Sequence, residues 1–188
     1  IGRNNKKSLT PVGNFALENN LNNINPKSLG SKKFKKKLID LNPDIFVIVA
    51  FKILPVSLIN LPKYGSVNLH ASLLPKYRGA GPIQWSLMNG DKTTGITIFQ
   101  IKKKVDTGDI LFQKVVKINK NDNMQSLGMR LCLIGAEMML FVLDNFLEKK
   151  IKKIPQSLDN ISLAPKITKD MLIINWSWSA RKIHNWIR

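Results

Sequence analysis

Three short runs of strand-forming residues, separated by room for helices, constrain the fold more than any other feature. The first, IFVIVA at 45–50, is continuously β-branched and aromatic, which is typical of a strand buried on both faces of a parallel sheet. The others are SVNLHA at 66–71 and GITIFQI at 95–101. Short helices are expected between them, near 56–59 and 83–88. This alternation predicts an α/β fold, a Rossmann-like open and mainly parallel sheet with helices on both faces.

Other elements are expected around this core. Residues 109–118 alternate weakly and predict an edge strand or a hairpin. The longest helix is predicted at 124–147, because its apolar residues recur at intervals of three and four along one core-facing stripe: Leu127, Leu131, Ile134, Met138 and Phe141. Cys132 lies in the same helix and is interpreted as a small core residue. Further helices are expected to begin near Pro11, after an N-cap at Ser31, and after a cap at Ser177 or Ser179.

Composition narrows the class of protein but does not identify it. A chain of 188 residues with 44% hydrophobic residues can form one ordinary globular domain. Its single cysteine excludes an internal disulfide framework and a multi-cysteine zinc site. No run of about 18 uninterrupted apolar residues predicts a membrane span. The formal net charge of +18 is explained equally well by polyanion binding and by a coding bias toward lysine, isoleucine and asparagine.

Three polar residues stand out within the segment 66–109. Asn68 and His70 are two apart on one expected strand, so their side chains project from the same face. Asp106 lies in the loop that follows the next strand, beside Thr107 and Gly108. If these strands are neighbours in a parallel sheet, all three polar side chains converge on the crevice at the carboxyl ends of the strands.

An amide, an imidazole and a carboxylate suit acyl transfer to an amine. Histidine titrates near neutrality and can take the proton that the attacking amine must lose. A carboxylate such as Asp106 can orient the imidazole of His70 or a proton-carrying water. The Asn68 amide can donate to the developing oxyanion. Because a lone strand histidine is more often an ordinary hydrogen-bonded residue, this spacing by itself leaves the function open.

The sequence around these three residues is a more specific signal. SVNLHASLLPKYRGAGPIQWSLMNGDKTTGITIF, continuing to VDTGDIL, resembles the folate-dependent formyltransferases, in particular those that act on methionyl-tRNA. The resemblance implies that Asn68, His70 and Asp106 are the catalytic set. It implies that the co-substrate is 10-formyltetrahydrofolate and that the site contains no metal. The turn that borders this co-substrate consists of Ser72, Leu73, Leu74 and Pro75. The strand at 45–50 matches the family's strand beside the pterin pocket.

The resemblance extends to both ends of the chain. GRNNKKSLTP is similar to the family's basic loop that contacts tRNA, which implies that Arg3 binds tRNA, and NWSWSARKIHNWIR is similar to the segment before the family's C-terminal barrel. It implies an N-terminally incomplete catalytic domain at 1–153 and a wrapping segment that starts a linker at 154–188. The family's first strand and its barrel are expected to lie outside these residues. The resemblance also implies that the partner is initiator methionyl-tRNA. It implies a monomer that works in the cytoplasm or an organelle matrix and does not bind a membrane.

Two alternatives stay open. The same site could formylate glycinamide ribonucleotide or a nucleotide-linked amino sugar, or could use water as the acceptor. Against the purine enzyme, Ala71 follows His70 where that enzyme usually has proline. The second alternative is a decayed, basic nucleic-acid-binding remnant, favoured by the net charge and by three lysines, Lys102–Lys104, where the family usually has an acidic residue and a glycine.

Overall fold

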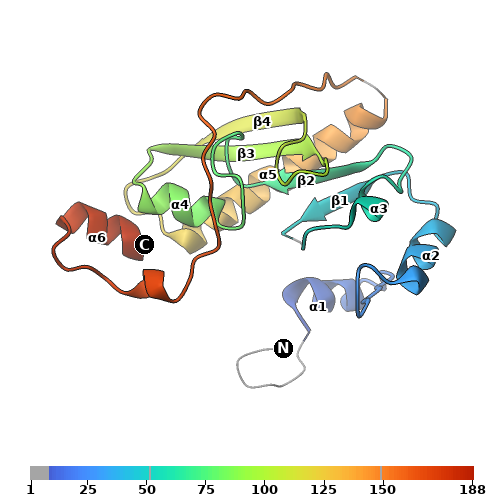
Figure 1. Ribbon diagram of the computed structural model, residues 1–188, viewed down its shortest axis with the longest axis horizontal. Coiled ribbons are helices and arrows are strands. Elements are labelled where there is room, and N and C mark those ends of the chain that lie inside the picture. Colours follow the sequence, from blue (N-terminus) through green and yellow to red (C-terminus); the bar gives the residue numbers. More distant parts are fainter. Residues whose placement is uncertain (1–8, 51, 149) are drawn as a thin grey trace. The chain divides into compact units, whose positions relative to one another are not determined.

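The computed structural model describes residues 9–50, 52–148 and 150–188 (Figure 1). The chain divides into two compact units, Ile1–Asp40 and Leu41–Arg188, and each is described by itself. The first unit contains α1 (Pro11–Glu18) and α2 (Lys32–Asp40). The Thr10 hydroxyl caps α1 by accepting from the Gly13 amide at 3.1 Å, and Pro11 occupies its first turn. Ser31 precedes α2, as expected, and accepts from the Phe34 amide.

The second unit is built on a four-stranded sheet in the order β1-β2-β3-β4. Its strands are β1 (Phe46–Val49), β2 (Ser66–His70), β3 (Thr93–Gln100) and β4 (Ile110–Lys117). β1 and β2 are parallel, whereas β2 with β3 and β3 with β4 are antiparallel. The α/β class is confirmed, and β4 is the expected edge strand. The expectation of a mainly parallel sheet is wrong for these four strands.

The connection after β2 explains the reversal. A parallel neighbour needs a crossover that carries the chain back to the start of the preceding strand. Here the chain enters α4 (Pro82–Met88), whose seven residues span only about 10 Å. The turn after it reaches Thr93 at the same end of the sheet as His70, and β3 therefore runs back along β2. In the resulting register His70 faces Thr97 and Val67 faces Gln100.

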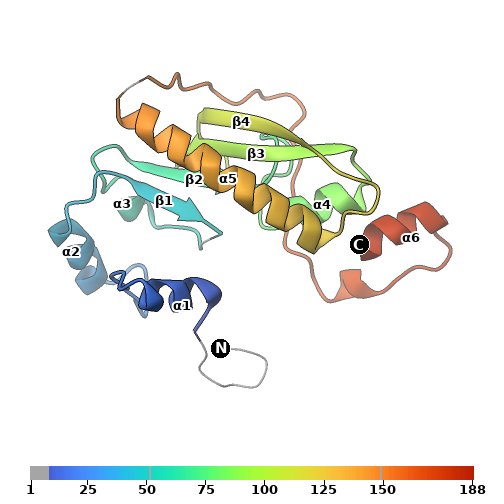
Figure 2. The same cartoon turned by 180° about the vertical axis from the view of Figure 1, so that it is seen from behind.

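One long helix, α5 (Met124–Leu147), covers one face of the sheet, behind it in Figure 1 and in front of it in Figure 2. Its boundaries are those predicted from the apolar periodicity. Leu127, Leu131 and Met138 are buried against Val67, Ile96 and Ile98 of the sheet, and Ile134 packs at the margin of this core. α4 lies against the N-terminal half of α5, where Ile83 approaches Gly128.

The other face of the sheet carries α3 (Val56–Ile59), which confirms helices on both faces (Figure 1). Ser66 at the start of β2 donates its hydroxyl to the Ile59 carbonyl at 2.7 Å, while Val67, the next residue, points into the core beneath α5. Alternation along the strand therefore places Ser66, Asn68 and His70 on the α3 face. Leu69 points the other way, toward Gly135 of α5.

The outward side of α5 corrects two expectations. Cys132 is exposed rather than a core residue, and Phe141 is half exposed, although its ring packs against Phe112 at 5.3 Å. Met129 and Leu133 are exposed on this side as well. By length and composition alone α5 is apolar enough to cross a membrane. In this structure its inward side packs on the apolar face of β3 and β4.

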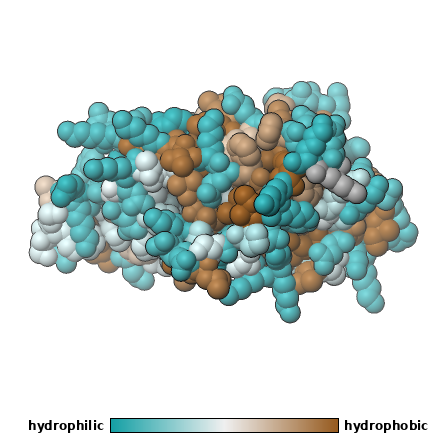
Figure 3. Space-filling model, turned by 90° about the horizontal axis from the view of Figure 1, so that it is seen from above, coloured by the Kyte–Doolittle hydropathy of each residue, from teal (hydrophilic) through white to brown (hydrophobic). Residues whose placement is uncertain are grey.

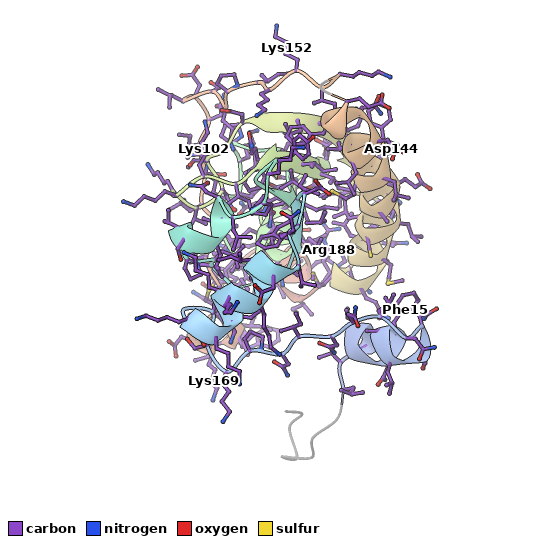
Figure 4. The ribbon with its side chains drawn as sticks, turned by 90° about the vertical axis from the view of Figure 1, so that its right-hand side faces the viewer. Phe15, Lys102, Asp144, Lys152, Lys169 and Arg188 are labelled. Carbon is purple, nitrogen blue, oxygen red and sulfur yellow. The ribbon has the colours of Figure 1, made fainter. Side chains whose placement is uncertain are left out.

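After α5 the chain is largely irregular, as the sequence pattern predicts. Its described residues, from 150 on, include the 3-10 turn η1 (Asp170–Leu172) and the helix α6 (Ala180–Ile187), which Ser179 caps by accepting from the Lys182 amide. The guanidinium of Arg188, labelled in Figure 4, donates to the Asp122 carbonyl at 3.2 Å. Viewed from above, hydrophilic side chains cover much of the surface, with apolar patches between them (Figure 3).

Candidate active site

His70 ends β2 on the face opposite α5, and only 7% of it is exposed. Its Nε2 lies 2.8 Å from the Tyr77 carbonyl oxygen, a contact that requires a proton on this nitrogen. In the neutral ring Nδ1 is then the basic atom. Phe99 of β3 supports the imidazole from the side, with the two rings edge-on at 6.5 Å between centroids. The imidazole is therefore held by one backbone acceptor and one aromatic wall.

Asp106 approaches the free side of this imidazole. Its Oδ2 lies 3.9 Å from His70 Nδ1 and accepts a 2.8 Å hydrogen bond from the Gly79 amide. The carboxylate is thus anchored to the backbone and close to the histidine without a direct hydrogen bond to it. One water about 2.8 Å from each atom could bridge them, with its two contacts close to a right angle.

The two residues meet for a different reason from the one expected. β3 runs antiparallel to β2, so it ends at Gln100, at the opposite end of β2 from His70. The loop 101–109 folds back across the α3 face of the sheet and so returns Asp106 to the histidine. Gly108 allows this path, because a Cβ there would lie 1.5 Å from the Gln100 carbonyl oxygen. The convergence that the sequence predicted is present, and a returning loop produces it.

Asn68 lies two residues before His70 on the same face, in register with Ile48 on one side and Phe99 on the other. It is partly buried. Within the described part of the chain its side chain has no hydrogen-bond partner, which leaves the amide free to donate to a bound group. The structure therefore brings all three predicted catalytic residues to one face, with His70 and Asp106 as the tightly held pair.

The predicted cofactor-binding turn follows β2 directly. Thr97 of β3 fixes it, because its hydroxyl donates to the Ser72 carbonyl at 2.7 Å and accepts from the Leu74 amide at 3.1 Å. Ser72 and Leu74 are buried, whereas Leu73 and Pro75 are partly exposed. A ligand at this turn would therefore contact the side chains of Leu73 and Pro75, with Ser72 and Leu74 acting as its support.

The segment 154–165 also supports the site, which the sequence pattern did not reveal. Gln156 donates through Nε2 to the Asp106 and Gly108 carbonyls at 3.0 and 2.9 Å, and its Oε1 accepts from Arg78 at 2.6 Å. One side chain thus joins the loop that carries Asp106 to the loop that follows His70. Gln156 lies in an irregular stretch with no motif around it, so no sequence signal pointed to it.

The same segment pairs with the loop after His70. The Arg78 amide donates to the Ser162 carbonyl at 2.9 Å, and the Ala164 amide donates to the Arg78 carbonyl at 2.7 Å. This approach depends on Gly79, whose φ is +128° and whose Cβ, if present, would lie 2.5 Å from the Ala164 carbonyl oxygen. Gly79, the first glycine of the RGAGP stretch, therefore permits this close approach and also donates a hydrogen bond from its amide to Asp106.

Tyr77 anchors the loop from its other side. Its hydroxyl donates to the Asp91 carboxylate at 2.6 Å and accepts from the side-chain amide of Asn89 at 2.9 Å. Burial, together with the hydrogen bond to Asp91, raises the pKa of Tyr77 to about 12. The Tyr77 carbonyl that accepts the hydrogen bond from His70 therefore belongs to a residue whose side chain is anchored in the turn before β3.

Other predicted features lie elsewhere. Arg3 falls outside the described residues. Lys102 pairs with Asp109 at 2.8 Å and, as Figure 4 shows, projects from the loop 101–109, while Lys103 and Lys104 are exposed beside it. Among the described residues no group of three or more His, Cys, Asp or Glu side chains could hold a metal ion.

The fold and the site together define an α/β protein with a histidine–aspartate pair on one sheet face, held by glycine-containing loops. The model of the formyl transferase family matches residues 1–143. Two relatives named methionyl-tRNA formyltransferase match the whole chain: that of Thermodesulfovibrio yellowstonii is 44% identical, and that of Acetivibrio thermocellus 39%. The chain therefore belongs to the formyl transferase family. It covers 61% and 60% of these relatives' own lengths.

Solved structures share the fold. The sugar 3N-formyl transferase WlaRD, crystallised with dTDP and 5-N-formyl-THF, superposes with a TM-score of 0.72 at 24% identity, over 93% of this chain and 61% of that one. At this identity the likeness extends to the fold alone. It agrees with the mixed α/β architecture described above.

Proposed function

We propose that this chain is the catalytic part of an enzyme that transfers the formyl group of 10-formyltetrahydrofolate to the amino group of initiator methionyl-tRNA. The pair formed by His70 and Asp106 carries this proposal. Nδ1 of the imidazole lies 3.9 Å from the carboxylate, while Nε2 is occupied by a backbone carbonyl. The name shared by relatives that match the whole chain supports methionyl-tRNA as the acceptor.

The chemistry assigns one role to each residue. The amine nitrogen attacks the formyl carbon, and the carbonyl oxygen becomes an oxyanion to which the free Asn68 amide donates. The amine proton passes to His70 Nδ1, directly or through a water held by Asp106, and then to the departing nitrogen of tetrahydrofolate. Asp106 stabilises the imidazolium between these two transfers. The products are formyl-methionyl-tRNA and tetrahydrofolate.

Binding of the donor is assigned to the turn after β2. Leu73 and Pro75 present apolar side chains there, with the buried Ser72 and Leu74 behind them. The folate ligand in the WlaRD crystals supports a folate donor for this fold, and the 10-formyl form is part of the proposal. Arg3 is proposed to contact the tRNA, in keeping with the basic character of its segment.

The organisation of the chain is proposed on the same footing. Residues 1–153 would form the catalytic domain, and 154–188 would support it and begin a linker to a C-terminal domain. The hydrogen bonds that Gln156 and Ser162 make with the site loops support the assignment of 154–188 as a segment that stabilises the catalytic domain. We further propose a monomer that acts in the cytoplasm without binding a membrane.

The test compares the two histidines of the chain. His70→Gln should lower turnover by about a hundredfold or more, because the amide cannot take the proton. His184→Gln, on the exposed face of α6, should leave turnover unchanged. Each variant protein is incubated with 10-formyltetrahydrofolate and charged initiator tRNA, and the formyl-methionine formed is measured. Equal activity of both variants would refute the role of His70, and formylation of an amino sugar instead of the tRNA would refute the acceptor.

A further inference from the structure

A cavity of about 550 Å³ lies at the end of the sheet opposite His70. It is lined by the loop before β2, the end of β3, the last turn of α5 and the segment after that helix; the residues are Asn60, Pro62, Lys63, Tyr64, Gly65, Gln100, Phe146, Ile151 and Lys153. Its volume is in the range of small-molecule sites. Five residues of strand, about 16 Å, separate Gly65 from His70. None of the residues assigned to formyl transfer contributes to it.

The lining combines two ammonium groups with two aromatic rings. Lys63 Nζ lies 5.1 Å from the centre of the Tyr64 ring, and Lys153 Nζ lies 5.4 Å from the centre of the Phe146 ring. Both lysines are exposed at the rim. A cation over a ring at an exposed site is held by only about 0.5–1 kcal/mol. Each ammonium can therefore turn toward an incoming anion at small cost.

The described lining contains no aspartate or glutamate, so neither lysine is neutralised within the cavity. Gln100 adds an amide donor, whose bond to the Tyr64 carbonyl is long at 3.4 Å. Lys152, next to Lys153, extends into solvent from the segment after α5, as Figure 4 shows when that end of the sheet faces the viewer. The two charged residues that line the cavity, Lys63 and Lys153, are thus both positive.

We propose that this cavity binds a planar aromatic group that carries a phosphate or a carboxylate. The ring lies against the partly exposed Tyr64 and against the small exposed part of Phe146, 7% of that residue, where aromatic pairs favour offset or edge-on contact. The anionic group meets Lys63 and Lys153 at the rim, and Gln100 donates to a polar atom of the ligand. Since the cavity is remote from His70, ligand and formyl donor bind at the same time.

Calorimetric titration with AMP, benzoate and uncharged adenosine tests this proposal. We expect AMP or benzoate to bind and adenosine to bind at least about tenfold more weakly than AMP, the factor for one lost charge-assisted contact. Binding of AMP but not benzoate would assign a nucleoside phosphate, and the reverse an aromatic carboxylate. If neither anion bound, or if adenosine bound as tightly as AMP does, the proposal would be overturned.

Matched double variants locate the site. Lys63→Gln with Lys153→Gln should weaken binding of the anion about tenfold or more. Lys166→Gln with Lys169→Gln removes the same charge from an exposed segment away from the cavity and should change binding less than twofold. All four lysines are exposed, so both proteins should fold. Equal weakening in both variants would overturn the assignment to this cavity.

Discussion

Asp122, just before the N-cap of α5, offers a quantitative test of the structure. Only 5% of it is exposed, and its carboxylate accepts from Arg130 Nη1 at 3.1 Å and Nη2 at 2.5 Å. It also accepts from the Asn119 amide at 2.6 Å and from the Ser126 hydroxyl at 3.1 Å. Arg130 donates further to the Lys117 carbonyl, so this cluster ties the end of β4 to the first turns of α5.

The magnitude follows from the pKa of this carboxyl group. The hydrogen bonds from Arg130, more than offsetting burial, lower the pKa of Asp122 from 3.8 to about 2. Nearly two pKa units correspond to about 2 kcal/mol of preference for the carboxylate over the neutral acid in the folded state. Asp122→Asn replaces the carboxylate by a neutral group of the same shape. It should therefore lower the free energy of unfolding at pH 7 by about 2 kcal/mol.

The pH dependence has a definite sign. The folded-state pKa of Asp122 lies below its unfolded value, so the stabilisation is complete above about pH 4 and is lost as the pH falls through about 2. The difference in unfolding free energy between the natural chain and Asp122→Asn should accordingly be constant from pH 7 to pH 5. It should shrink steadily between pH 4 and pH 2.

Urea unfolding followed by circular dichroism measures this difference at each pH. The pair of Glu148 and Lys150 at the other end of α5 is the control, because both side chains are more than half exposed. Glu148→Gln should change the unfolding free energy by less than about 0.5 kcal/mol. A cost below about 0.5 kcal/mol for Asp122→Asn, or a difference that grows toward acid pH, would refute the reasoning.

Three further outcomes are expected. Gly79→Ala should destabilise the protein by about 1–3 kcal/mol, because the added Cβ would meet a backbone oxygen at a residue whose φ is +128°. Gly30→Ala should be tolerated, because the nearest atom to its Cβ is 3.8 Å away, and thermal unfolding compares the two variants. In Tyr64→Phe the one remaining tyrosine, Tyr77, should ionise near pH 12 in an ultraviolet titration, and a midpoint near 10 would contradict its buried bond to Asp91. Gln156→Ala should leave the fold intact but lower turnover about tenfold by loosening the two site loops it joins; unchanged kinetics would remove it from the site.

Local pattern determined much of the fold. The interval of three and four between apolar residues located α5 at 124–147, because a helix must present one continuous stripe to the sheet. Runs of strand-forming residues located β1, β2 and β3 to within two residues at each end. Cys132 was misassigned because an apolar stretch does not reveal which side of a helix its neighbours cover.

The candidate site was found from the sequence because its motif, from SVNLHASLLP to VDTGDIL, is specific to one family. Alternation along one strand also placed Asn68 and His70 together, since side-chain direction in a strand is a local property. Both inferences depend on residues that are close in the chain, and both agree with where the structure puts these side chains.

Tertiary structure decided the remainder. The direction of β3 depends on how far the chain travels through α4, and only a loop folded back over the sheet brings Asp106 within 3.9 Å of His70. The proton position on the imidazole follows from the Tyr77 carbonyl, and the support from Gln156 comes from 50 residues beyond Asp106. Such contacts join segments distant in the chain, and their geometry is fixed by packing and hydrogen bonding that no local pattern records.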